Sequence, residues 1–217
     1  MSMGKGINNF PIAKEGFSYI LVLAVLSITF YFVLKPVFVL SLILLLFVLF
    51  FFRNPNRKIP DNMAAVVSPT DGRVMLVSEV YETEFIGAKA FKVTIFLSIF
   101  NVHINRSPID GIITYVKYRP GKYFPAFKSH ASEMNERNSV GIENETLKVL
   151  VHQITGFIAR RIVCRVDKGD SISKGQRYGM IKFGSCTEII VPMIVDLKIK
   201  AGDKVKAGCS VIGVLKS

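Results

Sequence analysis

The segment VDKGDSISKG, residues 166–175, is repeated as IKAGDKVKAG at residues 199–208. Both copies follow the pattern apolar-x-x-Gly-Asp-x-apolar-x-x-Gly, with matched positions 33 residues apart. A Gly-Asp pair closes a tight turn between two short strands, and the later glycine lets the chain turn back into the sheet. The repeat therefore predicts two equivalent β units related by a pseudo-twofold axis.

This unit resembles the hammerhead turn of lipoyl and biotinyl domains, which are barrel-like. The surrounding sequence favours a mainly β fold, because short β-branched and aromatic runs alternate with Gly, Pro, Asp or Asn. The predicted strands cover residues 66–67, 74–77, 90–96, 112–118, 146–154, 161–165, 180–183 and 188–192. Residues 127–138 are polar enough to predict a loop, which would lie over the functional site. We expect a barrel-like sandwich with lipoyl-type hammerhead repeats, preceded by an N-terminal hydrophobic helical hairpin.

The hairpin is predicted from two apolar runs in the N-terminal third of the chain. Phe17 to Leu34 is 18 residues long and Val37 to Phe52 is 16, with Lys35-Pro36 between them. A helix needs about 20 apolar residues to span a bilayer, so each run is short but suits a thin bilayer or snorkelling ends. One kinked span of both runs would be far too long, so we favour a hairpin, spanning or re-entrant. A buried hairpin of a soluble protein is the alternative.

The chain of 217 residues has room for one ordinary domain and an anchor. We predict an N-terminal tail at residues 1–16 and a membrane-anchoring hairpin at residues 17–52. A basic linker rich in Pro and Asn follows at residues 53–63, and the remaining domain occupies residues 64–217.

The net charge of +12 raises the question of nucleic acid binding. The basic residues are scattered and carry no zinc-finger, helix-turn-helix or RNP pattern, so an anionic membrane surface explains them better. Lys5 and Lys14 precede the hairpin, and Arg53, Arg57 and Lys58 follow it. The positive-inside rule therefore places both ends of the hairpin on the cytoplasmic side.

The three cysteines, Cys164, Cys186 and Cys209, show neither a CxxC pair nor another metal-ligand spacing. Pairing two of them would leave one over, which suits a reducing compartment. We expect no metal site.

Gly184-Ser185 has the chemistry of a self-cleavage site. The serine hydroxyl can attack the carbonyl of the preceding glycine, which tolerates a strained backbone, and convert the amide to an ester. Elimination then leaves dehydroalanine, which hydrolyses to a pyruvoyl group at the new chain end. Such a ketone can form a Schiff base with an amine and accept electrons as pyridoxal phosphate does. Most Gly-Ser pairs are turns, and that reading stays open here.

Several spaced motifs give this pair a context. They are Arg53-Asn54-Pro55, Ser68-Pro69-Thr70-Asp71-Gly72, Phe96-Leu97-Ser98, Asn101-Val102-His103-Ile104-Asn105-Arg106-Ser107-Pro108 and Phe183-Gly184-Ser185. In this order the chain resembles the short, membrane-anchored form of phosphatidylserine decarboxylase, a pyruvoyl-dependent lyase, over most of its length.

The resemblance implies a proenzyme that cuts itself between Gly184 and Ser185 and makes phosphatidylethanolamine for phospholipid biosynthesis. Large chain 1–184 would stay paired with small chain 185–217, because the cut falls between the two hammerhead units. It also implies the bacterial inner membrane as location, with the catalytic domain on the cytoplasmic side. The number of copies that assemble and the preferred acyl chains stay open.

Three residues are implied in catalysis. Ser185 becomes the pyruvoyl cofactor, and Asp71 acts in maturation by orienting a base or polarising the cut site. His103 is the leading acid or base, since an imidazole near neutrality suits protonation of the carbon that loses carbon dioxide. Taken alone, Asp71 in a Pro-Thr-Asp-Gly segment reads as a β-turn residue, and a lone histidine reads as a structural one.

Other polar residues are weaker candidates. Arg106, Arg160 and Arg161 suit binding of the substrate phosphate or carboxylate, and a solvated basic face explains them equally well. His130 lies in the predicted loop, and His152 reads as a strand residue facing a polar neighbour.

Two other functions account for part of the sequence. A membrane-anchored lipoyl-like adaptor explains the anchor and the repeat but leaves Asp71, His103 and Gly184-Ser185 without a role. A pyruvoyl decarboxylase of a soluble amino acid explains the cleavage site but does not need the hairpin.

Overall fold

The computed structural model describes residues 10–124, 134–156, 161–182 and 185–216. Contacts within the chain define a helical unit, Ile7–Asn56, and a β unit that begins at Arg57.

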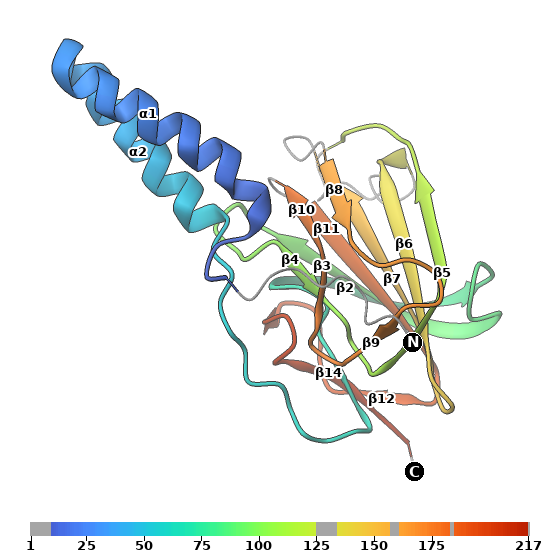
Figure 1. Ribbon diagram of the computed structural model, residues 1–217. Helices are drawn as coiled ribbons and strands as arrows, with labels where there is room; N and C mark the ends of the chain where they lie inside the picture. The colour runs from blue at the N-terminus through green and yellow to red at the C-terminus, as the bar shows by residue number, and fades with distance from the viewer. Residues whose placement is uncertain (1–9, 125–133, 157–160, 183–184, 217) are drawn as a thin grey trace. The chain divides into compact units, whose positions relative to one another are not determined.

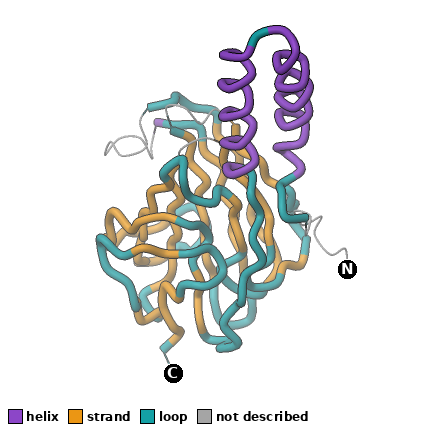
Figure 2. Tube along the Cα trace, turned by 90° about the vertical axis from the view of Figure 1, so that its left-hand side faces the viewer, coloured by secondary structure: helices purple, strands orange, loops and turns teal. Residues whose placement is uncertain are grey.

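The helical unit is a hairpin of two nearly equal helices, α1 (Phe17–Val33) and α2 (Lys35–Phe51), after the short 3-10 turn η1 (Lys14–Gly16). Leu34 is extended between the helices, and Pro36 lies in the first turn of α2, where its missing N–H costs no helical hydrogen bond. Figures 1 and 2 show the helices running side by side. The predicted hydrophobic helical hairpin is confirmed.

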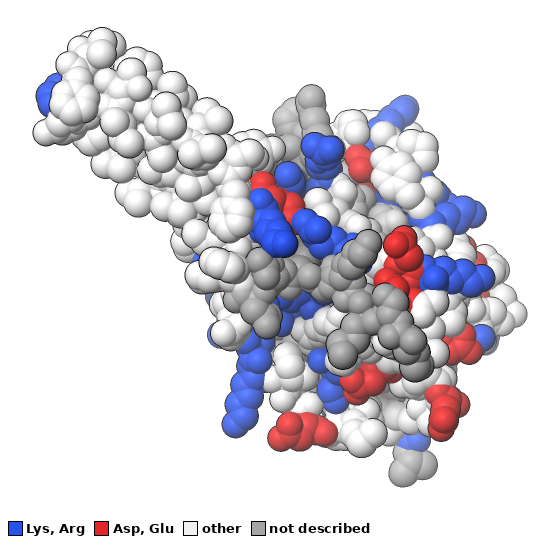
Figure 3. Space-filling model, viewed as in Figure 1, with Lys and Arg blue, Asp and Glu red and all other residues white. Residues whose placement is uncertain are grey.

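Polar contacts hold the hairpin at mid-height and at its base. The Ser27 hydroxyl donates to the Ser41 hydroxyl across the helix pair at 3.0 Å. At the base, the amide of Ala13 donates to the carbonyl of Phe52 at 2.8 Å. On the face seen in Figure 3, the hairpin shows almost no charged side chains between its two ends.

Among the described residues, one helical stretch is long and apolar enough to cross a membrane. It is Lys14–Val33, with 20 residues, and Lys35–Phe51 is a shorter apolar helix. At 1.5 Å per residue a 17-residue helix is about 25 Å long, which is below the roughly 30 Å of a hydrocarbon core. The length of Lys14–Val33 and the apolar composition of both helices are consistent with membrane association.

The described residues of the β unit form one large antiparallel sheet and two small ones (Figure 1). The large sheet has the order β13 (Lys204–Val205), β2 (Gly72–Glu82), β3 (Ala88–Leu97), β11 (Ser185–Pro192), β7 (Lys148–Thr155), β6 (Arg137–Glu143), β5 (Gly111–Arg119) and β9 (Ser171–Ile172). One small sheet has the order β1 (Ala65–Val67), β14 (Val211–Leu215) and β12 (Val195–Leu197). The other has the order β4 (Ile104–Arg106), β10 (Arg177–Lys182) and β8 (Arg161–Cys164).

The large sheet is pseudo-symmetric about its centre. Counted inward from the two edges, β13, β2, β3 and β11 of one half correspond in order to β9, β5, β6 and β7 of the other half. Each half carries one hammerhead repeat with the same hydrogen bonds. The amide of Gly202 donates to the carbonyl of Val74, and the amide of Gly169 donates to the carbonyl of Ile113, both at 2.8 Å. The two glycines have φ of 96° and 100°, which a side chain would strain. The predicted mainly β fold with two equivalent hammerhead units is confirmed.

The core lies between the large sheet and the small ones, and aliphatic residues from both halves fill it. Ile95 and Ile189 come from one half, and Ile113 and Ile142 come from the other; all four are fully buried. Each buried side chain of this size contributes about 1.5–3 kcal/mol, so the shared core holds the two halves together.

The sequence patterns missed the shortest strands and also two longer ones, the seven-residue β6 and the five-residue β14. Two- and three-residue strands such as β9 and β13 are too short for an alternating pattern. The loop predicted at residues 127–138 is wrong at its end, since Arg137 and Asn138 begin β6. Polar residues are stable there because the Asn138 amide donates to the Gln153 side-chain oxygen at 2.9 Å. Residues 127–133 of that segment lie outside the described residues.

Candidate active site

Asp71 has a close counterpart in the other half of the β unit. Ser68-Pro69-Thr70-Asp71-Gly72 recurs as Ser107-Pro108-Ile109-Asp110-Gly111 at the start of β5. Asp71 Oδ1 accepts from the amide of Ala207 at 2.8 Å, and Asp110 Oδ1 accepts from the amide of Lys174 at 2.9 Å. Ala207 and Lys174 hold the same position in the two hammerhead repeats. One oxygen of Asp71 therefore performs a structural role that the fold uses twice.

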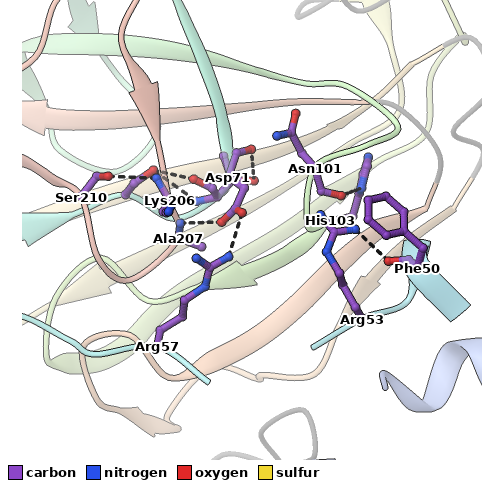
Figure 4. Close-up of polar contacts among 11 residues, drawn as sticks. Phe50, Arg53, Arg57, Asp71, Asn101, His103, Lys206, Ala207 and Ser210 are labelled. Atoms are coloured by element: carbon purple, nitrogen blue, oxygen red, sulfur yellow. Dashed lines mark hydrogen bonds and ion pairs between the residues drawn. The ribbon is translucent and has the colours of Figure 1, made fainter. Parts of the chain in front are cut away.

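Asp71 differs from Asp110 in the ion pair that its second carboxylate oxygen makes. Arg57 Nη2 lies 2.8 Å from Asp71 Oδ2, and both side chains are largely buried. Figure 4 shows the carboxylate turned toward Arg57 and Ala207. Asp71 also lines a pocket of about 580 Å³ together with Ser98 and Asn101. The Asp71 carboxylate therefore borders a cavity in which its negative charge can influence a reaction.

Ser185 is the first residue of β11, the strand next to the centre of the large sheet. Its Cα is paired with Leu97 of β3 on one side and with Thr155 of β7 on the other. The preceding strand, β10, ends at Lys182 in a small sheet. The chain therefore passes from one sheet to another between residues 182 and 185. Gly184 and the side chain of Ser185 lie outside the described part of the structure.

The pseudo-symmetry shows what is unusual about this position. In the other half, β6 and β7 are the counterparts of β3 and β11, and a tight turn connects them. In that turn the amide of Asn144 donates to the carbonyl of Leu147 at 3.0 Å. β3 and β11 have no such connection, because β11 follows β10 in sequence. Ser185 thus begins a strand at an open end of the sheet, where its counterpart is closed by a turn.

His103 is fully buried and lies directly before β4. Its Nδ1 is 2.9 Å from the carbonyl oxygen of Asn101 (Figure 4). A carbonyl only accepts, so Nδ1 carries the hydrogen and Nε2 is the basic nitrogen of the neutral ring. The carbonyl of His103 accepts from the amide of Ile181 at 3.1 Å, which ties the histidine backbone to the end of β10.

Asn101 joins the Phe96-Leu97-Ser98 motif to His103. Its Oδ1 accepts from the amide and the hydroxyl of Ser98 at 2.9 and 3.0 Å. Ser98 follows Leu97, which pairs with Ser185. The loop between β3 and β4 therefore links the residue opposite Ser185 to the histidine beside the end of β10. Asp71, Ser98 and Asn101 share one pocket, and the His103 ring is bonded to the backbone of that loop.

The predicted arginines do not form one group. Arg106 pairs with Arg177 at the start of β10, and Arg161 pairs with Lys182 at its end. At 3.4 Å per residue these two ends of the strand are about 17 Å apart. Arg106 is buried and donates to the carbonyl of Gly175 at 2.8 Å. Burial, with Arg177 and Arg57 nearby, lowers its pKa to about 10. Arg161 is exposed at the start of β8, and Arg160 lies outside the described residues.

Of the weaker candidates, His152 is a strand residue on β7, and His130 lies outside the described residues. His152 Nδ1 is 2.8 Å from the Ser139 hydroxyl. Burial, followed by the charges of Arg137, Lys92 and Arg119, lowers the pKa of His152 to about 3. The ring is therefore neutral over the physiological pH range, which suits a structural role.

We predict that His152 makes stability fall as pH falls. Its pKa rises from about 3 when folded to about 6.5 when unfolded, so between these values the unfolded chain binds one more proton. The free energy of unfolding should drop by about 1.4 kcal/mol per pH unit from this residue below about pH 6.5. Urea unfolding of His152→Asn, which keeps a partner for Ser139 but does not titrate, should show a shallower decline. Equal slopes in the two proteins would contradict this account.

Cys186 lies beside the proposed cut but is not placed as a nucleophile. It is buried, and burial raises the pKa of its thiol further above its usual value, with Glu188 contributing. Cys164 and Cys209 are free as well. Within the described ranges, no group of three or more His, Cys, Asp and Glu residues could hold a metal ion.

Sequence reasoning missed a buried polar chain beneath the start of β11. The Gln153 side chain donates to Asn105 Oδ1 at 2.9 Å, and the Asn105 amide donates to the Thr187 hydroxyl at 3.3 Å. Thr187 lies two residues after Ser185, so this chain fixes β11 against β4. The signal in the sequence was a set of polar residues inside otherwise apolar strands, which require partners when buried.

Comparisons with known proteins add to this geometry. The sequence profile described as phosphatidylserine decarboxylase matches residues 44–213. A phosphatidylserine decarboxylase proenzyme of Carboxydothermus hydrogenoformans is 53% identical over 204 residues, which cover 94% of this chain and 96% of the relative. The proenzyme of Symbiobacterium thermophilum is 45% identical over 94% of this chain and 95% of its own. That of Chlorobium limicola is 45% identical over 82% and 84%.

Proposed function

Since the chain belongs to the phosphatidylserine decarboxylase family, we propose that it becomes active by cutting its own backbone between Gly184 and Ser185. Its reaction is the decarboxylation of phosphatidylserine to phosphatidylethanolamine, and it is made as a proenzyme. The observation that carries the proposal is the position of Ser185 at the open end of β11, where the chain leaves one sheet for another.

In the proposed maturation, Ser185 Oγ attacks the Gly184 carbonyl carbon, and the amide becomes an ester as the nitrogen takes the proton. Elimination removes the Cα proton of residue 185 to a base and breaks the Cβ–O bond, which leaves a carboxylate on Gly184 and dehydroalanine at residue 185. Water then replaces the nitrogen, which leaves as ammonia, and a pyruvoyl group remains. When formed, this group supplies an electrophilic carbonyl that binds an amine and withdraws electrons as carbon dioxide departs.

The fold explains why cleavage need not separate the two chains. The new end of the large chain is held in a small sheet, where β10 pairs with β4 and β8. The small chain keeps β11 between β3 and β7, β13 against β2, and β14 against β1. We therefore expect residues 1–184 and 185–217 to stay together.

His103 and Asp71 have separate proposed roles. His103 takes up a proton on Nε2 and donates it to the carbon that has lost carbon dioxide, while Nδ1 keeps its bond to Asn101. Its backbone is tied to the segment that leads to Ser185. Asp71 acts during maturation through its charge, which it holds beside Arg57 in the pocket. Of the arginines predicted from the sequence, Arg161, on the strand that pairs with the last residue of β10, is the better placed for the substrate carboxylate.

The apolar hairpin associates with the membrane, where the headgroup of the insoluble substrate lies. Holding the domain at this interface raises the effective substrate concentration. We propose that the domain faces the cytoplasm at the bacterial inner membrane, because basic residues flank both ends of the hairpin.

Carbon dioxide release from two substrates tests this function. Purified full-length protein should release carbon dioxide from phosphatidylserine in mixed micelles and should do so at least about a hundredfold more slowly from free serine, which lacks the phosphate and lipid contacts. Comparable rates from both substrates would support a decarboxylase of a soluble amino acid. Release from neither substrate by a cleaved chain would contradict the proposed activity.

A further inference from the structure

Three cationic side chains gather at the pocket beside Asp71. Arg73, Lys204 and Lys206 line this cavity of about 580 Å³ together with Ser98 and Asn101. Arg73 on β2 and Lys204 on β13 are directly opposite each other in the sheet. Lys206 follows two residues after Lys204; both are exposed, while Val205 between them is buried. The three charges therefore share the outer side of the sheet edge.

The fold does not require these cations. Like charges directly opposite on neighbouring strands destabilise a sheet. In the other half, Ile112 pairs with Ser171 in the same register in which Arg73 pairs with Lys204. Ser173 holds the position equivalent to Lys206. The same turn therefore forms with an apolar residue and two serines, and the cations of this half need another explanation.

The pocket beside Asp110 and Gly111, which are the counterparts of Asp71 and Gly72, has a different charge. It has a volume of about 530 Å³ and is lined by Asp110, Gly111 and Asn144, among others. Its described lining contains Glu145 and neither Lys nor Arg. The cations are thus confined to the half in which β11 begins at Ser185.

We propose that Arg73, Lys204 and Lys206 bind the phosphodiester of the phosphatidylserine headgroup, and that this pocket is the headgroup site. Arg73 is opposite Phe96, which in turn is opposite Cys186, the residue after Ser185. Two strand spacings separate Arg73 from Cys186, or about 10 Å, which long cationic side chains can bridge. The amine and phosphorus of the headgroup are separated by only two carbons and one oxygen. The pocket also reaches Ser98, the residue after Leu97, which pairs with Ser185. An anion at the cations therefore places the amine near the end of β11 at which residue 185 lies. This assignment rests on the proposed function.

The other half of the β unit, which contains β5 and β9, provides the design of the test. The double variant Lys204→Ser and Lys206→Ser copies Ser171 and Ser173, so the turn should still form. We expect normal cleavage and a KM for phosphatidylserine raised on the order of tenfold, with kcat changed much less, because charged hydrogen bonds to the phosphate are lost. Arg73→Ile, which copies Ile112, should act in the same direction. The matched control, Ser171→Lys with Ser173→Lys, should leave KM unchanged.

A soluble substrate separates headgroup binding from attraction to a charged bilayer. Short-chain phosphatidylserine, used as monomers below its micelle concentration, should still show the raised KM. A defect seen only with anionic vesicles would mean that the cations bind the membrane surface, and would overturn the assignment. An unchanged KM, or loss of cleavage in the double variant, would overturn it as well.

The outcomes remain distinct from a failure of the proposed function. If the parent protein is not cut or releases no carbon dioxide, the function itself fails. If the parent is active and the double variant keeps its KM, only the headgroup site fails. Lys206→Ser alone, which lies outside the β13 pairing, serves as the second variant should the double variant unfold.

Discussion

Replacing Ser185 with Ala is expected to leave one intact chain of 24.2 kDa and no decarboxylase activity. Alanine has no hydroxyl to attack the Gly184 carbonyl, so neither the ester nor the ketone can form. The fold should survive, because residue 185 contributes its backbone to the pairing with Leu97 and Thr155. A denaturing gel and an activity assay on the same sample check both parts of this prediction.

Cys186→Ala provides the matched control for that variant. The thiol is buried next to the cut, and its removal should lower stability without preventing cleavage. A Ser185→Ala protein that is still processed would show that another residue cuts the chain. Loss of cleavage in both variants would point to a damaged fold instead of a missing nucleophile, which intact mass and circular dichroism would reveal.

The second large effect is expected from Asp71→Asn. Asparagine can still accept the Ala207 amide, so the turn is kept and only the charge is lost. If the charge acts in maturation, cleavage should slow by about a hundredfold, which is typical of a lost acid-base group. The rate is measured by following the appearance of the small chain after synthesis.

Asp110→Asn is the control that the pseudo-symmetry offers. Asp110 makes the same bond to the amide of Lys174, and its pocket lies at the closed end of the sheet. This variant should mature at the parental rate. Equal maturation of Asp71→Asn and Asp110→Asn would mean that Asp71 is only a turn residue.

Arg57 must be considered in the same experiment, because Asp71→Asn leaves its guanidinium without the carboxylate partner. Breaking a buried ion pair from one side can cost about 3–5 kcal/mol. The double variant Asp71→Asn with Arg57→Gln removes both charges and should recover much of that stability. It should not recover cleavage, which separates a chemical role of Asp71 from a structural one.

The fold class could be predicted from the sequence because its decisive turns are local. Each hammerhead repeat needs glycines with positive φ at two positions, and this requirement is visible in ten residues. The second internal repeat, Ser68 to Gly72 and Ser107 to Gly111, was equally visible but is 39 residues apart instead of 33. The two repeats therefore do not share one period. The shortest strands could not be found, since their partners and not their own residues define them.

The candidate site was predictable only in part. Motif order singled out the segments, but the spatial links between them depend on sheet pairing. Sequence alone gave no sign that Asn101 would bond both Ser98 and the His103 ring. Nor could it show that Arg106 and Arg161 lie at opposite ends of β10. Such separations depend on register, which a tertiary fold sets and a linear motif does not.

The mass of the small chain from active protein tests the central claim most directly. Our account predicts a 33-residue fragment, residues 185–217, whose first residue is a pyruvoyl group and which therefore has no free α-amino group. Reaction with a carbonyl reagent should shift its mass, and sequential degradation from the N-terminus should fail. An active protein with an unbroken chain and an unmodified Ser185 would contradict the account.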